Sequence, residues 1–183
     1  KMGKIFIKEI KKHKNFKIIR ILNQRLIKKN PKIVKDFFKS KKINLIVIAS
    51  PVSTHFKYLE FAYKNNKNVI VEKPLVENIN QLKKLVKVNR NYNKKIMIHH
   101  NDVLNFQKFK ILDNSNMVHK VEMIYGKKEK KNAYSKPFFD WLPHPLSMII
   151  NHFGVPIKFK VVKYLKVLKT NLVSEDLQLE FIL

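Results

Sequence analysis

The sequence predicts an α/β fold in which a Rossmann-type parallel sheet is followed by the start of an α+β domain with a largely antiparallel sheet. Short β-branched runs alternate with helical segments over the first 115 residues, which is typical of a doubly wound parallel sheet. Two of these runs end in polar residues and a proline, at Ser50-Pro51 and at Glu72-Lys73-Pro74. After about residue 116 the runs become longer and alternate with period two. We therefore expect two domains, residues 1–115 and 116–183.

Each element of the first domain follows from a local pattern. An amphipathic helix is expected from the first residues to Ile10, because positions 5, 6, 7 and 10 are apolar. Strands are expected at Phe16–Leu22, Leu45–Ala49, Val69–Val71 and Lys95–His99. Helices are expected at Pro31–Lys41, Thr54–Asn65, Asn78–Asn89 and Leu104–Asp113. Pro31 suits the first turn of its helix, and Thr54 is the expected N-cap of the next one.

The second domain is predicted to mix long strands with one helix. Met117–Tyr125 reads as a strand and Gly126–Lys136 as a charged loop. A helix is expected over Pro145–Phe153, with proline at its first position and Gly154 just after its end. The alternating stretches Ile157–Leu168 and Leu177–Leu183 are expected strands, the last of which reaches the end of the sequence.

The charge of +26 in 183 residues raises the question of a nucleic-acid or anionic-membrane partner. All but three of the 39 basic residues are lysine, the exceptions being Arg20, Arg25 and Arg90. Proteins that read phosphates or bases draw on the bidentate fork of arginine. The lysines here are spread over every segment, alongside abundant Asn and Ile. We therefore expect a compositional bias and no nucleic-acid partner.

The chain has no cysteine, so it forms no disulfide and offers no thiolate chemistry. Its apolar runs are far shorter than the roughly 18 residues that a membrane helix needs. No signal-peptide pattern opens the sequence. We expect a cytoplasmic protein without a membrane partner.

Three motifs occur in a fixed order: Ser50-Pro51-x-x-x-His55, Glu72-Lys73-Pro74 and Asp140-x-x-x-His144. Together they resemble the glucose–fructose oxidoreductase / inositol dehydrogenase (Gfo/Idh/MocA) family, and the resemblance runs from Gly3 to about Pro156. It implies an oxidoreductase that transfers a hydride between NAD or NADP and a carbon of a sugar, polyol or nucleotide-linked sugar. The lead alternative is a catalytically silent relative or fragment that acts as a binding module.

The resemblance assigns the reaction centre to Lys73, His144 and Asp140. It implies that Lys73 lies between the nicotinamide ribose and the reacting hydroxyl, and that His144 lies across the substrate as an acid or base. A histidine titrates near neutral pH, and a lysine with a depressed pKa could share the proton transfer, so the identity of the base stays open. Asp140 would fix His144 or bind a substrate hydroxyl. The Lys73–Pro74 bond is expected to be cis.

The resemblance also implies the wall of the cofactor site. Ser50, Pro51 and His55 resemble its nicotinamide side, although Val52 stands where the family often has asparagine. Glu72 would contact the cofactor or orient Lys73.

The two ends of the dinucleotide site are predicted from the first and second strands. Met2 and Gly3 resemble the end of Gly-x-Gly-x-x-Gly, so we expect a strand and two glycines to precede them in the gene. After Leu22, NAD-preferring domains place an acid, whereas this chain has Asn23 and Arg25. NADP is therefore at least as plausible as NAD, although Arg25 also fits a solvated loop.

The remaining expectations concern substrate, metal and assembly. His100 and Asn105 resemble a subgroup pattern for substrate contact, and Trp141 could stack on a sugar ring or fill a domain interface. Adjacent residues on a strand point to opposite faces, so His99 and His100 are not expected to share a metal. Self-association through the sheet of the second domain is the expected oligomeric contact.

Overall fold

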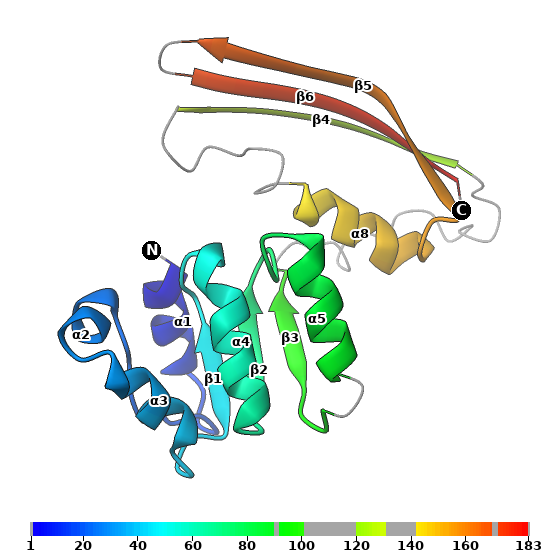
Figure 1. The fold of residues 1–183 in the computed structure, drawn as a ribbon. Coiled ribbons are helices and arrows are strands. Elements are labelled where there is room, and N and C mark those ends of the chain that lie inside the picture. Colours follow the sequence, from blue (N-terminus) through cyan, green and yellow to red (C-terminus); the bar gives the residue numbers. More distant parts are fainter. Residues whose placement is uncertain (1, 90–91, 101–119, 131–141, 170–171, 183) are drawn as a thin grey trace. The chain divides into compact units, whose positions relative to one another are not determined.

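The computed structural model describes residues 2–89, 92–100, 120–130, 142–169 and 172–182 (Figure 1). Their contacts form two units, Lys1–His99 and His100–Leu183, and each unit is described by itself. The predicted domain boundary and the predicted helix Leu104–Asp113 fall in the segment 101–119, which lies outside the described residues. Both stay predictions.

The first unit is built on a three-stranded parallel sheet. Its strands are β1 (Leu45–Ile48), β2 (Asn68–Glu72) and β3 (Ile96–His99), in the order β1-β2-β3. The strands lie in parallel register, with Ile48 opposite Val71 and Val71 opposite Ile98. The three predicted strands are confirmed to within one residue at most ends, because their β-branched runs suit a sheet that is buried on both faces.

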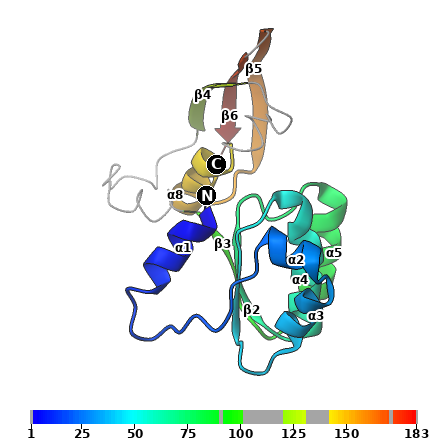
Figure 2. The same ribbon diagram turned by 90° about the vertical axis from the view of Figure 1, so that its left-hand side faces the viewer.

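Helices connect the strands and cover both faces of this sheet. They are α1 (Met2–Ile10), α2 (Gln24–Lys29), α3 (Lys32–Lys39), the 3-10 turn η1 (Val52–Thr54), α4 (His55–Lys64) and α5 (Ile79–Asn89). Figure 2 shows α1 on one side of the sheet and α2 to α5 on the other. This arrangement confirms the predicted α/β class.

The core of the first unit lies between β1, β2 and the helical layer. Leu59 and Val71 are fully buried, and Ile46 and Val69 are nearly so. On α4 the buried positions are His55, Leu59 and Ala62, which recur at intervals of four and three residues and so share one face of the helix. The same periodicity that anchors α4 in the core therefore turns the His55 ring toward the sheet.

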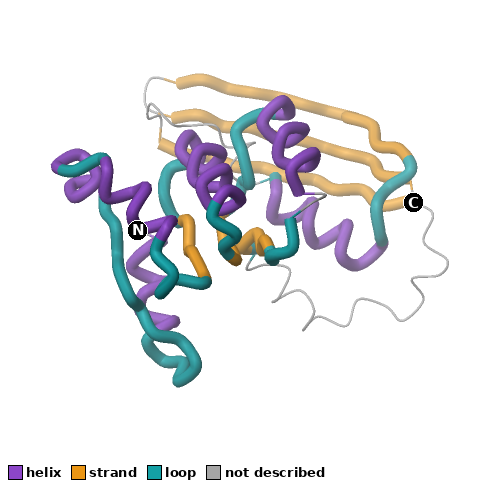
Figure 3. The backbone as a smooth tube through the Cα atoms, turned by 60° about the horizontal axis from the view of Figure 1, so that its bottom comes forward, coloured by secondary structure: helices purple, strands orange, loops and turns teal. Residues whose placement is uncertain are grey.

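The predicted strand Phe16–Leu22 is wrong. Residues 11–23 form an irregular connection (Figure 3), and the side chains of Phe16, Ile19 and Ile21 are each about half exposed, at 53%, 49% and 47%. A β-strand needs a neighbouring strand to bond its backbone. The sheet order of the described strands places none beside this segment. The short helix α2, which the sequence did not predict, follows directly.

Two helix starts also differ from expectation. Thr54 precedes α4, but its hydroxyl donates to the Pro51 carbonyl at 2.8 Å and does not cap the helix. The 3-10 turn Val52–Thr54 folds the Pro51 carbonyl back to within hydrogen-bond reach of this hydroxyl. The helix α8 (Pro143–Phe153) begins two residues before the predicted start, with Pro143 at its first position and Gly154 after its end.

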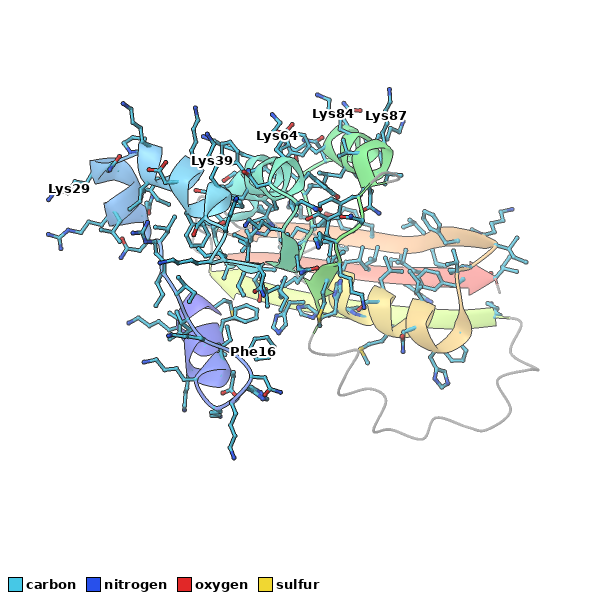
Figure 4. All side chains as sticks on the ribbon, turned by 90° about the horizontal axis from the view of Figure 1, so that it is seen from below. Phe16, Lys29, Lys39, Lys64, Lys84 and Lys87 are labelled. Carbon is cyan, nitrogen blue, oxygen red and sulfur yellow. The ribbon has the colours of Figure 1, made fainter. Side chains whose placement is uncertain are left out.

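A buried lysine ties the loops at the opposite end of the sheet. The Lys67 Nζ donates to the Ser40 carbonyl at 2.7 Å and to the Ile43 carbonyl at 2.6 Å. The Tyr92 hydroxyl donates to the Lys67 carbonyl. Burial, with a smaller contribution from Tyr63, raises the pKa of Tyr92 to about 12, so this hydroxyl keeps its proton. By contrast, the lysines labelled in Figure 4, which belong to α2, α3, α4 and α5, point away from the sheet.

The second unit is a three-stranded antiparallel sheet with α8 on one face. Its strands are β4 (Lys120–Lys130), β5 (Lys158–Lys169) and β6 (Leu172–Ile182), in the order β4-β6-β5. Ile149 of α8 packs with Leu177, Leu179 and Phe181 of β6. This unit confirms the predicted antiparallel sheet.

The strands are longer than predicted, which corrects two boundaries. Residues 126–130, expected in a loop, continue β4, and β6 begins at Leu172 and not at Leu177. The ladder runs without a break from Lys120 opposite Ile182 to Lys130 opposite Leu172. Ladder bonds use backbone groups only, so charged side chains do not end a strand. Residues 131–136 of the predicted loop lie outside the described residues.

The sheet face away from α8 carries charged pairs. The Lys120 Nζ lies 3.0 Å from a carboxylate oxygen of Glu122 and 3.0 Å from one of Glu180. Ile124, on the same face, is largely exposed. Self-association through this sheet stays a prediction.

Candidate active site

The carboxyl ends of the three parallel strands bring several polar residues together at one edge of the sheet. Because β1, β2 and β3 are parallel and in register, their carboxyl ends lie together. Ser50 and Pro51 come shortly after the end of β1. Glu72 is the last residue of β2 and is followed by Lys73 and Pro74. His99 is the last residue of β3 and is followed by His100. The carboxyl edge is where open α/β sheets bind ligands.

Lys73 follows a strand that is anchored in the core. Val69 and Val71 point into the buried layer, Glu72 is the last and still buried residue of β2, and Lys73 is half-buried beyond it. The Lys73–Pro74 peptide bond is cis, as expected. The sequence therefore delivers an amine to the edge of the sheet from a rigid element.

Glu72 is held by a partner that sequence reasoning missed. The His99 Nδ1 donates to the Glu72 Oε1 at 2.7 Å, and both side chains are more than four-fifths buried. Glu72 and His99 are the last residues of neighbouring strands and lie opposite each other in register. That shared end position is the signal that could have revealed the pair. The Phe6 ring of α1 packs against the His99 ring with centroids 4.6 Å apart.

His55 connects two of the strand ends. Its Nδ1 lies 3.0 Å from the Pro74 carbonyl oxygen, and its Nε2 lies 2.9 Å from the Ser50 carbonyl oxygen. The Ser50 hydroxyl lies 2.6 Å from the Thr54 hydroxyl. Since Thr54 donates to the Pro51 carbonyl, Ser50 is the donor in that pair. The three residues predicted for the nicotinamide side, Ser50, Pro51 and His55, thus share one bonded turn.

The start of α1 lies at the same edge. A Cβ built on Gly3 would lie 4.0 Å from the Cβ of Ala49, which is ordinary contact distance, so the helix start approaches the end of β1 closely. The first turn of α1 contains no acidic residue, and Lys4 belongs to it. Unbonded N–H groups and a positive field at a helix start suit an anion.

The residues predicted to select between NAD and NADP lie at α2. Asn23 is the N-cap of α2, and its Oδ1 accepts the Leu26 N–H at 2.9 Å. Arg25 is exposed in the first turn of this helix, which also lacks an acidic residue. In Figure 1, α2 lies on the β1 side of the sheet. Contact of these two residues with a cofactor stays a prediction.

The other predicted site residues belong to the second unit or lie outside the description. His144 is the second residue of α8 and half-buried, and its carbonyl accepts the Ser147 hydroxyl at 2.7 Å. His144 therefore lies inside the helix, whereas the sequence predicted it to lie just before the helix start. His100 is half-buried directly after β3. Asp140, Trp141 and Asn105 lie outside the described residues, and their roles stay predictions.

Within the described ranges, no group of three or more His, Cys, Asp or Glu side chains is placed to hold an ion. The helices of those same ranges include none with the length and apolar character needed to cross a membrane.

Comparison with protein families and curated proteins identifies one family and a partial relative. Residues 1–100 match the model of the oxidoreductase family with an NAD-binding Rossmann fold (GFO_IDH_MocA). Oxidoreductase P35 of Formosa agariphila is 27% identical over 132 residues, which cover 61% of this chain and 41% of that protein.

Three solved structures share the fold at low sequence identity. A candidate oxidoreductase from Magnetospirillum magnetotacticum has a TM-score of 0.73 at 17% identity, with 92% of this chain and 59% of that one covered. A candidate myo-inositol dehydrogenase from Sinorhizobium meliloti gives 0.66 at 15%, covering 92% and 57%. The biliverdin reductase of Synechocystis, solved with biliverdin and NADP+, gives 0.50 at 19%, covering 70% and 44%. The chain thus spans from about two-fifths to three-fifths of the length of these four proteins.

Proposed function

The chain belongs to the Gfo/Idh/MocA oxidoreductase family, and we propose that it catalyses NAD(P)-dependent hydride transfer at a hydroxyl-bearing carbon of a sugar or polyol. The observation that carries the proposal is the half-buried Lys73 at the carboxyl edge of the parallel sheet. The residues on both sides of Lys73 are anchored, Glu72 by His99 and Pro74 by His55. An amine held in this way suits a reaction that requires a precisely placed proton carrier.

The described residues fit a dinucleotide. The start of α1, with Met2 and Gly3, offers N–H groups and no acidic residue to the pyrophosphate. Ser50 and Pro51 would line the nicotinamide side, and Arg25 would meet the ribose end. The cofactor, when bound, supplies the hydride acceptor or donor at its nicotinamide ring.

The protein's own groups would manage the proton. Oxidation of a carbinol releases a proton from the hydroxyl, which needs an acceptor within hydrogen-bond reach. Lys73 and His144 are the proposed carriers, and the choice of the base between them stays open. Glu72, fixed by His99, would hold the backbone next to Lys73 in place. Asp140 is proposed to orient His144 or a substrate hydroxyl.

Support for the substrate class is of two kinds. The motif order resembles a family that acts on sugars and polyols, and the Sinorhizobium protein named above carries the name of a polyol enzyme. The Synechocystis protein was solved with biliverdin, a substrate of another chemical class. Assays should therefore include a panel of sugars and polyols and, beside it, biliverdin. His100, Asn105 and Trp141 are the proposed substrate contacts.

Fluorescence titration with NADPH and NADH tests the cofactor assignment. In an Arg25→Ala variant we expect NADPH binding to weaken by about 1–3 kcal/mol, because a charge-assisted bond to the 2′-phosphate is lost. NADH binding should change little.

Arg20→Ala is the matched control, since Arg20 is an exposed arginine in the connection before α2. Equal losses for both cofactors in Arg25→Ala would contradict a preference for NADP. Saturable binding without turnover of any substrate in the panel would instead favour a catalytically silent relative.

A further inference from the structure

The buried ring of His55 makes two contacts of the same chemical kind. Its side chain is among the largest fully buried ones in the described chain, with 1% of its surface exposed. Both partners are backbone carbonyl oxygens, Pro74 at 3.0 Å from Nδ1 and Ser50 at 2.9 Å from Nε2. A carbonyl oxygen only accepts hydrogen bonds. Each of the two contacts therefore needs an N–H on the ring.

Neutral imidazole cannot satisfy both contacts. It carries one N–H and one lone pair, and in a buried site the lone pair would face a carbonyl oxygen without a proton between them. Only the imidazolium form has an N–H on each nitrogen. The two carbonyl dipoles point their negative ends at the ring and favour its charged form, whereas burial of the ring and its place at the start of α4 oppose that form.

We propose that His55 is a positioning residue that holds both ring protons and clasps the turn after β1 to the turn that carries Lys73. This inference rests on the proposed function in so far as Lys73 is the reacting amine. Pro74 directly follows Lys73, and Ser50 is one of the two residues proposed to line the nicotinamide side. His55 itself is the first residue of a helix whose Leu59 and Ala62 lie in the core. Through these contacts, a helix that is anchored in the core would hold both the Ser50 turn and the Lys73-Pro74 turn in place.

The clasp gives His55 a role different from the one predicted from the motif. The resemblance made His55 part of the cofactor wall, whereas both of its nitrogens are engaged by the backbone. Its effect on the reaction would pass through the Lys73-Pro74 turn. Loss of the Pro74 bond should therefore affect catalysis more than loss of the Ser50 bond.

Two substitutions separate the bonds. The amide nitrogen of asparagine is as many bonds from Cβ as Nδ1, and that of glutamine as many as Nε2. His55→Asn can therefore still reach Pro74, and His55→Gln can still reach Ser50. We expect turnover to fall by about 100-fold in His55→Gln, the scale of a small misplacement of a reacting group, and to be largely restored in His55→Asn. His13→Asn, on an exposed histidine, should match the wild type.

The first test needs no activity. In the 183-residue chain labelled with ¹⁵N at its histidines, NMR at about pH 7.5, where a free imidazole is mostly neutral, should show a proton on both nitrogens of His55. The signals that vanish in either His55 variant assign the ring. A His55 ring with one unprotonated nitrogen overturns the proposal.

Competitive labelling of lysine amines, read by mass spectrometry, is the second test. The reactivity of Lys73 should change several-fold in His55→Gln and little in His55→Asn, with the exposed Lys64 as the internal reference in each sample. Unchanged Lys73 reactivity in both variants overturns the positioning role, and so does equal turnover in both. If the wild type itself transfers no hydride, the proposed function fails, while the NMR and labelling results still decide the clasp.

Discussion

Replacing Lys73 with methionine is expected to lower turnover by about 10²–10⁴-fold, the usual contribution of a positioned acid–base group. Methionine keeps the length and the apolar stem of the side chain and removes only the amine. The chain around it should stay folded, because Glu72 is held by His99 and the Pro74 carbonyl by His55. Initial rates of NAD(P)H formation, followed by absorbance, measure the effect.

Lys64→Met is the matched control for this prediction. Lys64 is exposed at the end of α4 and points away from the sheet (Figure 4). Lys64 has the same charge and the same flexible side chain as Lys73, but it is remote from the carboxyl ends of the strands. Wild-type turnover in Lys73→Met, or an equal loss in Lys64→Met, would remove Lys73 from the reaction centre.

Replacing His144 with alanine should also reduce turnover by about 10²–10⁴-fold, but with the affinity for NADPH and NADH nearly intact. His144 belongs to the second unit, whereas the residues predicted to bind the dinucleotide belong to the first and are unchanged in this variant. A drop in the catalytic rate with unchanged cofactor binding is the signature of a proton carrier and not of a binding residue.

His152→Ala tests whether that effect is specific. His152 lies on the same helix, in its last turn, and has no proposed part in the reaction. Circular dichroism checks that both variants keep α8. If His144→Ala retains full turnover, or loses cofactor affinity in parallel with rate, the proton-transfer role of His144 is contradicted.

The parallel sheet could be predicted because its signals are local. Runs such as Leu45–Ile48 contain the β-branched residues of a buried strand within four or five positions, and prolines mark their exits. Phe16–Leu22 has the same local signal and is not a strand. The difference is that a strand needs a neighbouring strand to pair with. A local sequence pattern does not show whether such a neighbour is present.

The start of α8 could not be fixed from the sequence because two prolines give the same local signal. Pro143 and Pro145 both suit the first turn of a helix, where the missing N–H would have no partner. The sequence pattern could not choose between them, and the earlier proline begins the helix. His144 moves into the first turn as a consequence.

The composition of the candidate site was predictable, but its bonds were not. Lys73 and Glu72 were found because a strand end and a motif coincide. The partners of the surrounding groups are distant in sequence: His55 reaches Pro74 over 19 residues, and His99 reaches Glu72 over 27. Such contacts follow from strand register and helix packing, which have to be known before the pairs can be read.

The most direct test of the account is whether a hydride moves between a carbinol carbon and the nicotinamide. The protein would be given NAD+ or NADP+ and sugars and polyols deuterated at the carbinol carbon. Mass spectrometry of the reduced cofactor should find the deuterium on the nicotinamide ring with at least one substrate, and the label should accumulate about 10²–10⁴-fold more slowly with Lys73→Met. Absence of the label in every reaction of the wild-type protein would contradict the assignment of this chain as an NAD(P)-dependent sugar or polyol oxidoreductase.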